Sequence, residues 1–260
     1  MPAQNIILCL NKDLHSYYCA RQLLPFLSRY KLHFFISEQV GNPAKSSVPS
    51  PLQMLSFLEK IVPFEVLENA ASFEKLAQEN SASLAYFLPN EKDRALKTLK
   101  KIAPDLIISI RFGMIFSQEM ISTTRLGILN LHSGILPNYR GVMPTFWSMH
   151  NNEKEIGCSL HWISDATIDT GDIITIHRQK LDPELCYIGN VAKLYEQGIK
   201  ILIEALPEAL SGRLENAKPQ PKEEAYYSFP TISHLETFYK NNWKLFSSEG
   251  YRIALNQGTA

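Results

Sequence analysis

Clustered cysteines, an excess of one charge and long apolar runs are all missing from this sequence. Its four cysteines, Cys9, Cys19, Cys158 and Cys186, lie far apart and form no CxxC or Cys/His cluster. We therefore predict neither a disulfide framework nor a metal site, and a reducing, cytoplasmic setting. The apolar run at residues 5–10 follows no basic region and is too short for a signal peptide or a membrane span.

Charge is balanced, with 26 lysines and arginines against 26 aspartates and glutamates. A neutral chain does not attract nucleic acid or an anionic membrane over a broad surface, so we expect neither as a partner. Apolar residues make up 45% of the chain, an ordinary share for a globular protein that buries its own core. The length of 260 residues fits one large domain or a domain with an appendage.

Short apolar runs alternate with helical patterns through the first half of the chain. The expected strands are residues 5–11, 31–37, 83–88, 105–110 and 127–132, and Asp13 is the expected N-cap of the first helix. Residues 41–51 predict a surface loop, and residues 52–80 a broken helical stretch. Strands that alternate with helices indicate βαβ units, and hence an α/β fold with a doubly wound, mostly parallel sheet.

The second half of the chain follows a different pattern. Residues 157–164 and 172–181 predict two more strands joined by a loop, and residues 187–210 a long helix whose apolar side packs in the core or against a second subunit. Residues 217–224 predict a polar, proline-bearing linker. We therefore expect a main domain at residues 1–212 and a C-terminal extension at residues 213–260, with a homodimer as the candidate assembly.

The densest group of chemically active residues is NLHSGILPNYRG, residues 130–141. Asn130 and His132 are two apart on a predicted strand, so both side chains point to one face near its carboxyl end, where α/β sheets bind ligands. Downstream, DATIDTGDII at residues 165–174 gathers three acids in one turn. Acyl transfer to an amine needs a donor for the carbonyl oxygen, a group that handles the amine proton and a carboxylate that orients an imidazole. Asn130, His132 and Asp169 supply these three chemistries.

Three motifs together resemble the signature of the folate-dependent formyltransferase family: Asn130-x-His132, the LPxYRG loop at residues 136–141 and IDTGD at residues 168–172. The resemblance is specific between residues 105 and 181, and the family's catalytic trio falls on Asn130, His132 and Asp169. It implies the fold already predicted, with 10-formyltetrahydrofolate as formyl donor. It also implies that Asn130 and protonated His132 hold the oxyanion while Asp169 orients His132. Whether His132, Asp169 or a water takes the amine proton stays open.

The resemblance also implies a pterin pocket between two loops, one after the fourth strand and one carrying the aspartate. Backbone amides and carbonyls do much of the recognition in such a pocket. The implied contacts are Phe112, Gly113, Met114 and Ile115 in the first loop, Leu136, and Asp165, Ala166, Thr167 and Ile168 in the second loop.

The acceptor amine differs among members of the family. Methionyl-tRNA formyltransferases share the LPxYRG loop but carry a sizeable C-terminal barrel for tRNA, and the stretch after residue 181 is too short for one. Glycinamide ribonucleotide transformylases resemble the core but differ in this loop. A sugar-nucleotide N-formyltransferase with a short C-terminal extension fits best, so the expected acceptor is the amine of a nucleotide-linked amino sugar.

Candidate acceptor contacts follow from this expectation. Lys12, Arg140 and Arg178 are candidate phosphate partners, and Tyr226, Tyr227 and Phe229 are candidates for stacking on a base. These aromatic residues fit a role in capping the domain or pairing subunits equally well. The turn after the first strand lacks a glycine-rich loop, so a phosphate site and a purely structural turn are equally open there.

Several other polar residues fit structural roles. His161 and His177 lie on apolar strands and are expected to be structural, and Asp172 is expected to bond its own turn. Two alternatives of other kinds remain: a formyl hydrolase that uses water as acceptor, and a catalytically silent folate-binding protein. The intact trio argues against the silent protein.

Overall fold

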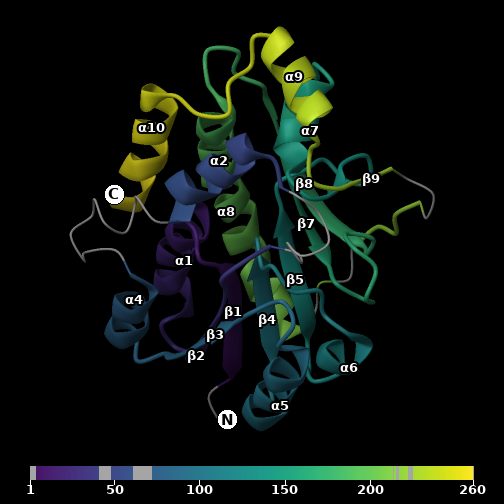
Figure 1. Ribbon diagram of the computed structural model, residues 1–260. Coiled ribbons are helices and arrows are strands. Elements are labelled where there is room, and N and C mark those ends of the chain that lie inside the picture. Colours follow the sequence, from purple (N-terminus) through teal and green to yellow (C-terminus); the bar gives the residue numbers. More distant parts are fainter. Residues whose placement is uncertain are drawn as a thin grey trace.

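The computed structural model describes residues 4–40, 48–60, 72–212, 214, 217–221 and 225–259, and its main feature is a seven-stranded sheet (Figure 1). The strand order is β3-β2-β1-β4-β5-β7-β8, with bounds β1 Asn5–Asn11, β2 Lys31–Ser37, β3 Ser83–Phe87, β4 Leu106–Ile110, β5 Gly127–His132, β7 Glu155–Trp162 and β8 Ile173–Lys180. β1 to β5 pair in parallel, whereas β7 and β8 are antiparallel to their neighbours. The predicted α/β class and mostly parallel sheet are therefore confirmed.

Helices flank the sheet, and in the described ranges they are α1 Leu14–Leu27, α2 Ser50–Lys60, α4 Phe73–Glu79, α5 Lys92–Ile102, α6 Gln118–Ile121, α7 Pro144–His150, α8 Tyr187–Ser211, α9 Ile232–Lys240 and α10 Ser248–Thr259. α1 begins where predicted, because Asp13 Oδ1 accepts a hydrogen bond from the Ser16 amide at 2.8 Å. Pro25 was expected to disturb the last turns, yet α1 continues to Leu27. None of the described helices is both long and apolar enough to cross a membrane.

The loop predicted at residues 41–51 is shorter than expected, because Ser50 already begins α2. Residues 41–47 of that loop lie outside the described residues. The predicted broken helical stretch corresponds to α2 and α4, and residues 61–71 between them also lie outside the described residues.

The central strand β1 is buried on both faces because helices cover each side of the sheet (Figure 1). Ile6, Leu8 and Leu10 belong to the larger core cluster, which includes residues of α1 and α8. Ile7 and Cys9 belong to the opposite cluster, which includes residues of α5 and α6. Successive side chains of a strand point to opposite faces, so a strand covered on both sides needs an almost continuous apolar run.

The described part of the C-terminal segment packs along the main body. α10 contacts α8 and α1, and α9 contacts α7. A two-residue strand β9, Tyr226–Tyr227, pairs in parallel with β6, Arg140–Gly141, which belongs to the LPxYRG loop. The segment beyond the sheet therefore reaches the loop that follows β5.

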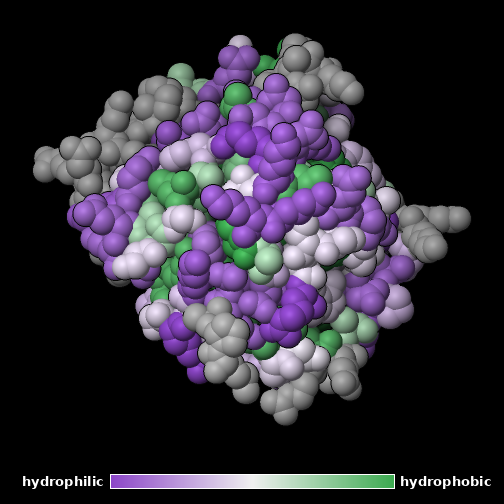
Figure 2. Space-filling model, turned by 90° about the horizontal axis from the view of Figure 1, so that it is seen from below, coloured by the Kyte–Doolittle hydropathy of each residue, from purple (hydrophilic) through white to green (hydrophobic). Residues whose placement is uncertain are grey.

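The two ends of the sheet differ in character. Figure 2 views the end at which the parallel strands begin, where hydrophilic residues predominate and hydrophobic ones form small groups between them. The large cavity of the molecule lies toward the other end, where those strands finish.

Candidate active site

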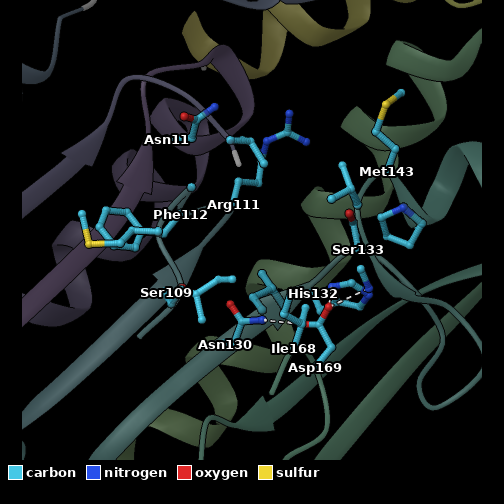
Figure 3. A pocket seen from close by; sticks show the side chains of 18 of the residues that line it. Asn11, Ser109, Arg111, Phe112, Asn130, His132, Ser133, Met143, Ile168 and Asp169 are labelled. Carbon is cyan, nitrogen blue, oxygen red and sulfur yellow. Dashed lines mark hydrogen bonds and ion pairs between the residues drawn. The ribbon is translucent and has the colours of Figure 1, made fainter. Parts of the chain in front are cut away.

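A cavity of about 910 Å³ lies along the carboxyl-terminal parts of the parallel strands (Figure 3). Asn11 is the last residue of β1, His132 is the last of β5, and residues 111–116 follow β4. α2 and the loop between β7 and β8 supply further walls. Strand ends of this kind are where α/β sheets bind ligands, and the volume is within the range of small-molecule sites.

The three residues of the predicted trio, Asn130, His132 and Asp169, lie close together at one end of this cavity (Figure 3). Asn130 Nδ2 is 3.4 Å from Asp169 Oδ1, and His132 Nδ1 is 3.5 Å from Asp169 Oδ2. β5 presents the amide and the imidazole two residues apart, and the loop between β7 and β8 brings the carboxylate to them. The structure thus brings together side chains that are 39 positions apart in the chain.

His132 is held at both ring nitrogens. Its Nε2 lies 2.7 Å from the carbonyl oxygen of Tyr139. A carbonyl oxygen only accepts hydrogen bonds, so Nε2 carries a hydrogen and donates it. Nδ1 faces the Asp169 carboxylate, and is therefore the nitrogen that can gain or lose a proton beside it.

Asp169 is ionised at neutral pH despite its burial, with a side chain only 10% exposed. Burial alone would raise the pKa of Asp169 above its ordinary value of 3.8. The charge of His132, the hydrogen bond and charge of His161, and the Gly141 amide 2.8 Å from Oδ2 outweigh burial and lower the pKa to about 2. A carboxylate with this pKa can orient an imidazole but holds a proton poorly.

His161 was expected to be structural, and in the structure its buried ring contacts two residues of the trio. Its Nε2 lies 2.9 Å from Asn130 Nδ2 and 3.5 Å from Asp169 Oδ1, while its Nδ1 donates to the Trp162 carbonyl oxygen at 2.8 Å. When neutral, the ring accepts from Asn130; when protonated, it can donate to Asp169. The contact follows from the β5–β7 register, which places His161 opposite Asn130 and is seen only in the structure.

The other residues expected to be structural lie elsewhere. His177 on β8 does not line the cavity, and Asp172 is exposed at the start of that strand. Cys9, Cys19, Cys158 and Cys186 are buried and free.

The predicted pterin contacts fall on the cavity wall with two exceptions. Leu136 is 2% exposed, and its amide is bonded to Ser159 Oγ, so this side chain packs in the core instead. Ala166 is exposed and does not line the cavity. Those that line the cavity are Phe112, Gly113, Met114, Ile115, Asp165, Thr167 and Ile168.

Two of the three aromatic residues proposed for base stacking reach the cavity. Tyr226 and Phe229 line its wall. Tyr227 instead stacks on Tyr139 with ring centroids 5.5 Å apart, so the prediction for Tyr227 as an acceptor contact is wrong. This packing fixes β9 against the LPxYRG loop and leaves Tyr226 beside the cavity.

The three cations proposed as phosphate partners do not line the cavity. The Lys12 ammonium lies 5.2 Å from the centre of the Tyr86 ring. Arg140 is 4% exposed and its guanidinium donates to the Pro221 carbonyl oxygen, while Arg178 is exposed on β8. Each finds a partner or solvent outside the site, which charge alone does not reveal.

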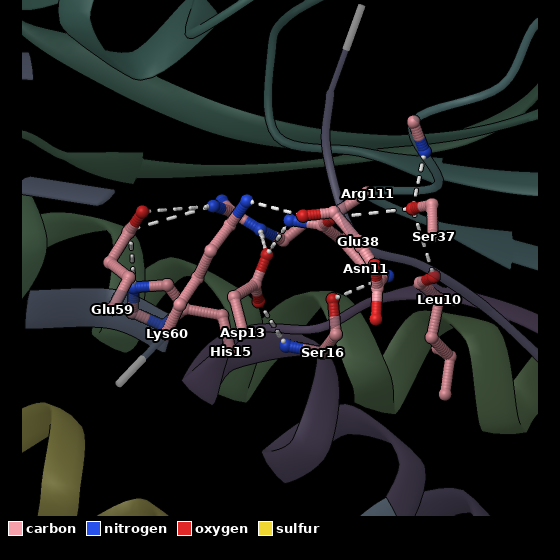
Figure 4. A network of polar contacts seen from close by, with 11 residues as sticks. Leu10, Asn11, Asp13, His15, Ser16, Ser37, Glu38, Glu59, Lys60 and Arg111 are labelled. Atoms are coloured by element: carbon pink, nitrogen blue, oxygen red, sulfur yellow. Dashed lines mark hydrogen bonds and ion pairs between the residues drawn. The ribbon is translucent and has the colours of Figure 1, made fainter. Parts of the chain in front are cut away.

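The turn after β1 is occupied by a buried ionic network (Figure 4). Asp13 is fully buried and caps the N-terminus of α1, and Arg111 lies 2.9 Å from Asp13 Oδ2 and 3.4 Å from Glu59 Oε2. Burial opposes ionisation of Asp13, but the charges of Arg111 and His15 lower its pKa below the ordinary value. Because the Asp13 carboxylate already occupies the N-terminus of α1, where a phosphate would bind, the structure favours a structural turn over a phosphate site here.

Comparison with known proteins identifies the family of this chain. Residues 59–206, more than half of the chain, match the formyl transferase family. The methionyl-tRNA formyltransferase of Clostridium tetani is 31% identical over 155 residues, which cover 60% of this chain and 48% of that protein. That of Cyanothece sp. is 34% identical over 140 residues, 53% of this chain and 41% of that protein, so this chain spans about half the length of such relatives or less.

Solved structures share the fold over most of the chain. An N-formyltransferase from Helicobacter canadensis, solved with folinic acid and dTDP-3-aminofucose, has a TM-score of 0.62 at 18% identity, over 96% of this chain and 82% of that one. A 4-N formyltransferase from Francisella tularensis has a TM-score of 0.60 at 16% identity, over 98% and 87%. With the match over residues 59–206, we conclude that the chain belongs to the formyl transferase family.

Proposed function

We propose that this protein transfers a formyl group from 10-formyltetrahydrofolate to a primary amine, and that the amine belongs to a nucleotide-linked amino sugar. The observation that carries the proposal is the meeting of Asn130, His132 and Asp169 at one wall of a cavity of about 910 Å³. The proposed donor site lies beside them, where residues 112–115 line the cavity and supply apolar side chains for a pterin.

The chain's residues can each take one part of this reaction. Bound 10-formyltetrahydrofolate supplies the formyl carbon, to which the amine adds as the bond to the folate nitrogen breaks, with one proton leaving the amine and one reaching that nitrogen. Asn130 Nδ2 lies 2.9 Å from His161 and 3.4 Å from Asp169. The N–H that makes the longer, weaker contact is the one that we expect to turn to the oxyanion. His132 Nδ1, protonated beside Asp169, is the second donor.

The proton of the amine then needs an acceptor other than Asp169. A group with a pKa of about 2 is too weak a base to keep a proton at neutral pH. We therefore assign Asp169 to orientation and charge stabilisation, and the amine proton to water, because a His132 ring with a hydrogen on both nitrogens cannot accept another.

An amino-sugar acceptor is supported by two observations. The Helicobacter canadensis protein with this fold was solved with dTDP-3-aminofucose. Tyr226 and Phe229 place two aromatic rings on the cavity wall, where a base can stack.

Methionyl-tRNA is the second candidate acceptor, favoured by the 31% identity to the Clostridium tetani enzyme over 155 residues. The balanced charge of 26 basic and 26 acidic residues gives no broad attraction to tRNA, which is why this candidate stands second.

An acceptor panel tests the proposal directly. Purified protein and 10-formyltetrahydrofolate are combined with nucleotide-linked amino sugars, glycinamide ribonucleotide, methionyl-tRNA or no acceptor, and release of tetrahydrofolate is followed. We expect turnover with an amino-sugar nucleotide, and a fall in kcat of roughly a hundredfold or more in Asn130→Ala and in His132→Ala. Asn90→Ala, on an exposed turn, is the matched control and should keep full activity.

Other results of the acceptor panel and of the variants would lead to different conclusions. Turnover with methionyl-tRNA alone would select the second candidate, and turnover without any acceptor would indicate a hydrolase. Near wild-type activity in Asn130→Ala would remove the proposed mechanism.

A further inference from the structure

We propose that Gln220, in the C-terminal extension, is a positioning residue that holds the Asp169 loop against Asn130 and His132. The proposal rests on the proposed formyl transfer, because it concerns the geometry of the same site. The extension would then be part of the catalytic site, in addition to any contact it makes with the acceptor.

Asp169 needs outside support because of its backbone conformation. Its φ of 56° lies in the left-handed region, which is less favourable than the right-handed region for a residue other than glycine, although aspartate tolerates it better than most. Its carboxylate meets Asn130 at 3.4 Å and His132 at 3.5 Å, which is the outer limit for such contacts. A small displacement of this turn would separate the carboxylate from both partners.

Gln220 supplies that support from across the turn. Its Nε2 donates to the carbonyl oxygen of Asp169 at 3.1 Å and to that of Gly171 at 2.5 Å. Both partners only accept, so the nitrogen end of the amide must face the turn. Gln220 Oε1 is buried and has no hydrogen-bond partner among the described residues, so the donor end alone ties this side chain to the turn.

The segment that carries Gln220 is itself bonded to the frame of the site. Lys218 and Ile173, the first residue of β8, exchange two backbone hydrogen bonds of 2.8 Å. Arg140 donates to the carbonyl oxygen of the residue after Gln220, and the neighbouring Gly141 amide donates to the loop carboxylate at 2.8 Å. The extension therefore supports both the backbone of the Asp169 turn and the strand that binds its carboxylate.

Gln220→Glu is the sharpest test, because the side chain keeps its size while an ionised carboxylate faces two carbonyl oxygens. We expect kcat at pH 8 to fall on the order of 10²-fold, as it does when a catalytic group is displaced. The KM for 10-formyltetrahydrofolate should rise as well, because residues 165–168 of the displaced loop line the cavity and are predicted pterin contacts. Toward pH 5 the protonated carboxyl can again donate one bond, so the deficit in kcat should shrink.

Gln118→Glu is the matched control, because it makes the same change of charge on an exposed residue of α6. Its kcat and pH profile should follow the wild type. Hydrogen exchange of the amides at residues 163–173, measured without substrates, provides a readout independent of catalysis. Exchange should be faster in Gln220→Glu and unchanged in Gln118→Glu.

These readouts separate the two proposals. If the wild type transfers no formyl group but the loop exchanges faster in Gln220→Glu, the proposed function fails and the positioning of the loop stands. Unchanged kcat and unchanged exchange in Gln220→Glu would overturn the positioning role. A loss of kcat that accompanies a general loss of thermal stability, without recovery toward pH 5, would also overturn it.

Discussion

The Asp169 carboxylate makes a measurable contribution to stability, because its pKa in the folded protein is about 2 against an ordinary value of 3.8. The folded state binds fewer protons than the unfolded state between these two values, so stability rises with pH through this window and is fully present above it. The difference between these two pKa values corresponds to about 2 kcal/mol of stability, and about 1 kcal/mol of this is lost between pH 5 and pH 3. Asp169→Asn removes the titrating group while it keeps the side-chain size.

Urea unfolding at pH values from 3 to 7 measures this contribution. The free energy of unfolding of the wild type should exceed that of Asp169→Asn by about 2 kcal/mol above pH 5, and the gap should narrow as the pH falls toward 3. Asp172→Asn is the matched control, since Asp172 is an exposed carboxylate three residues away. A gap between the wild type and Asp169→Asn that is independent of pH would refute the assigned pKa and its causes.

Three further substitutions test neighbouring parts of the site. His161→Gln should lower kcat roughly tenfold with little change in folate KM, because Asn130 loses the ring that orients it at 2.9 Å; equal kcat in steady-state kinetics would contradict this. Asp13→Asn should lower the free energy of unfolding by about 3 kcal/mol in urea, because Arg111 then lacks its 2.9 Å partner; a loss below about 1 kcal/mol would count against a buried ion pair. Gly113→Ala should weaken folate binding roughly tenfold in calorimetry, because the added methyl meets the Gln39 carbonyl; unchanged affinity would place the pterin elsewhere.

Most of the sheet could be predicted because its signal is local. The runs that became β1 and β2 are apolar on both faces, and the predicted boundaries of both agree with the structure. No local sequence pattern predicts the direction of β7 and β8, because that direction depends on how the chain returns to the sheet after α7. Two strands were expected there, but their antiparallel pairing became visible only in the structure.

The site shows the same division between local and distant information. Asn130 and His132 could be paired from sequence because a strand repeats every two residues. His161 approaches Asn130 only through the register of an antiparallel neighbour, 31 positions away. Gln220 lies in a segment whose polar composition predicts a linker, and its contact with Asp169 spans 51 positions. The composition of this segment shows that it is polar, but it does not show which residues the segment contacts.

The phosphate groups of the proposed acceptor should contribute little to its affinity. Among the described residues that line the cavity, Lys60 and Arg111 are the lysine and the arginine. The Lys60 ammonium donates to the Glu38 carbonyl oxygen at 2.8 Å, and the Arg111 guanidinium lies between two carboxylates, so a diphosphate would have to compete with existing partners. Tyr226, 52% exposed at the cavity wall, offers a stacking surface to a base instead.

As competitors of the acceptor, a nucleoside diphosphate should therefore inhibit at roughly tenfold lower concentration than inorganic pyrophosphate, because stacking of one base contributes about 1–3 kcal/mol. Tyr226→Ala should remove most of that difference and leave inhibition by pyrophosphate unchanged. Equal inhibition by the two compounds in the wild type would mean that phosphate recognition dominates. The ionic network of Asp13, Arg111 and Glu59 would then have to open when the acceptor binds, since it holds Arg111 at 2.9 and 3.4 Å.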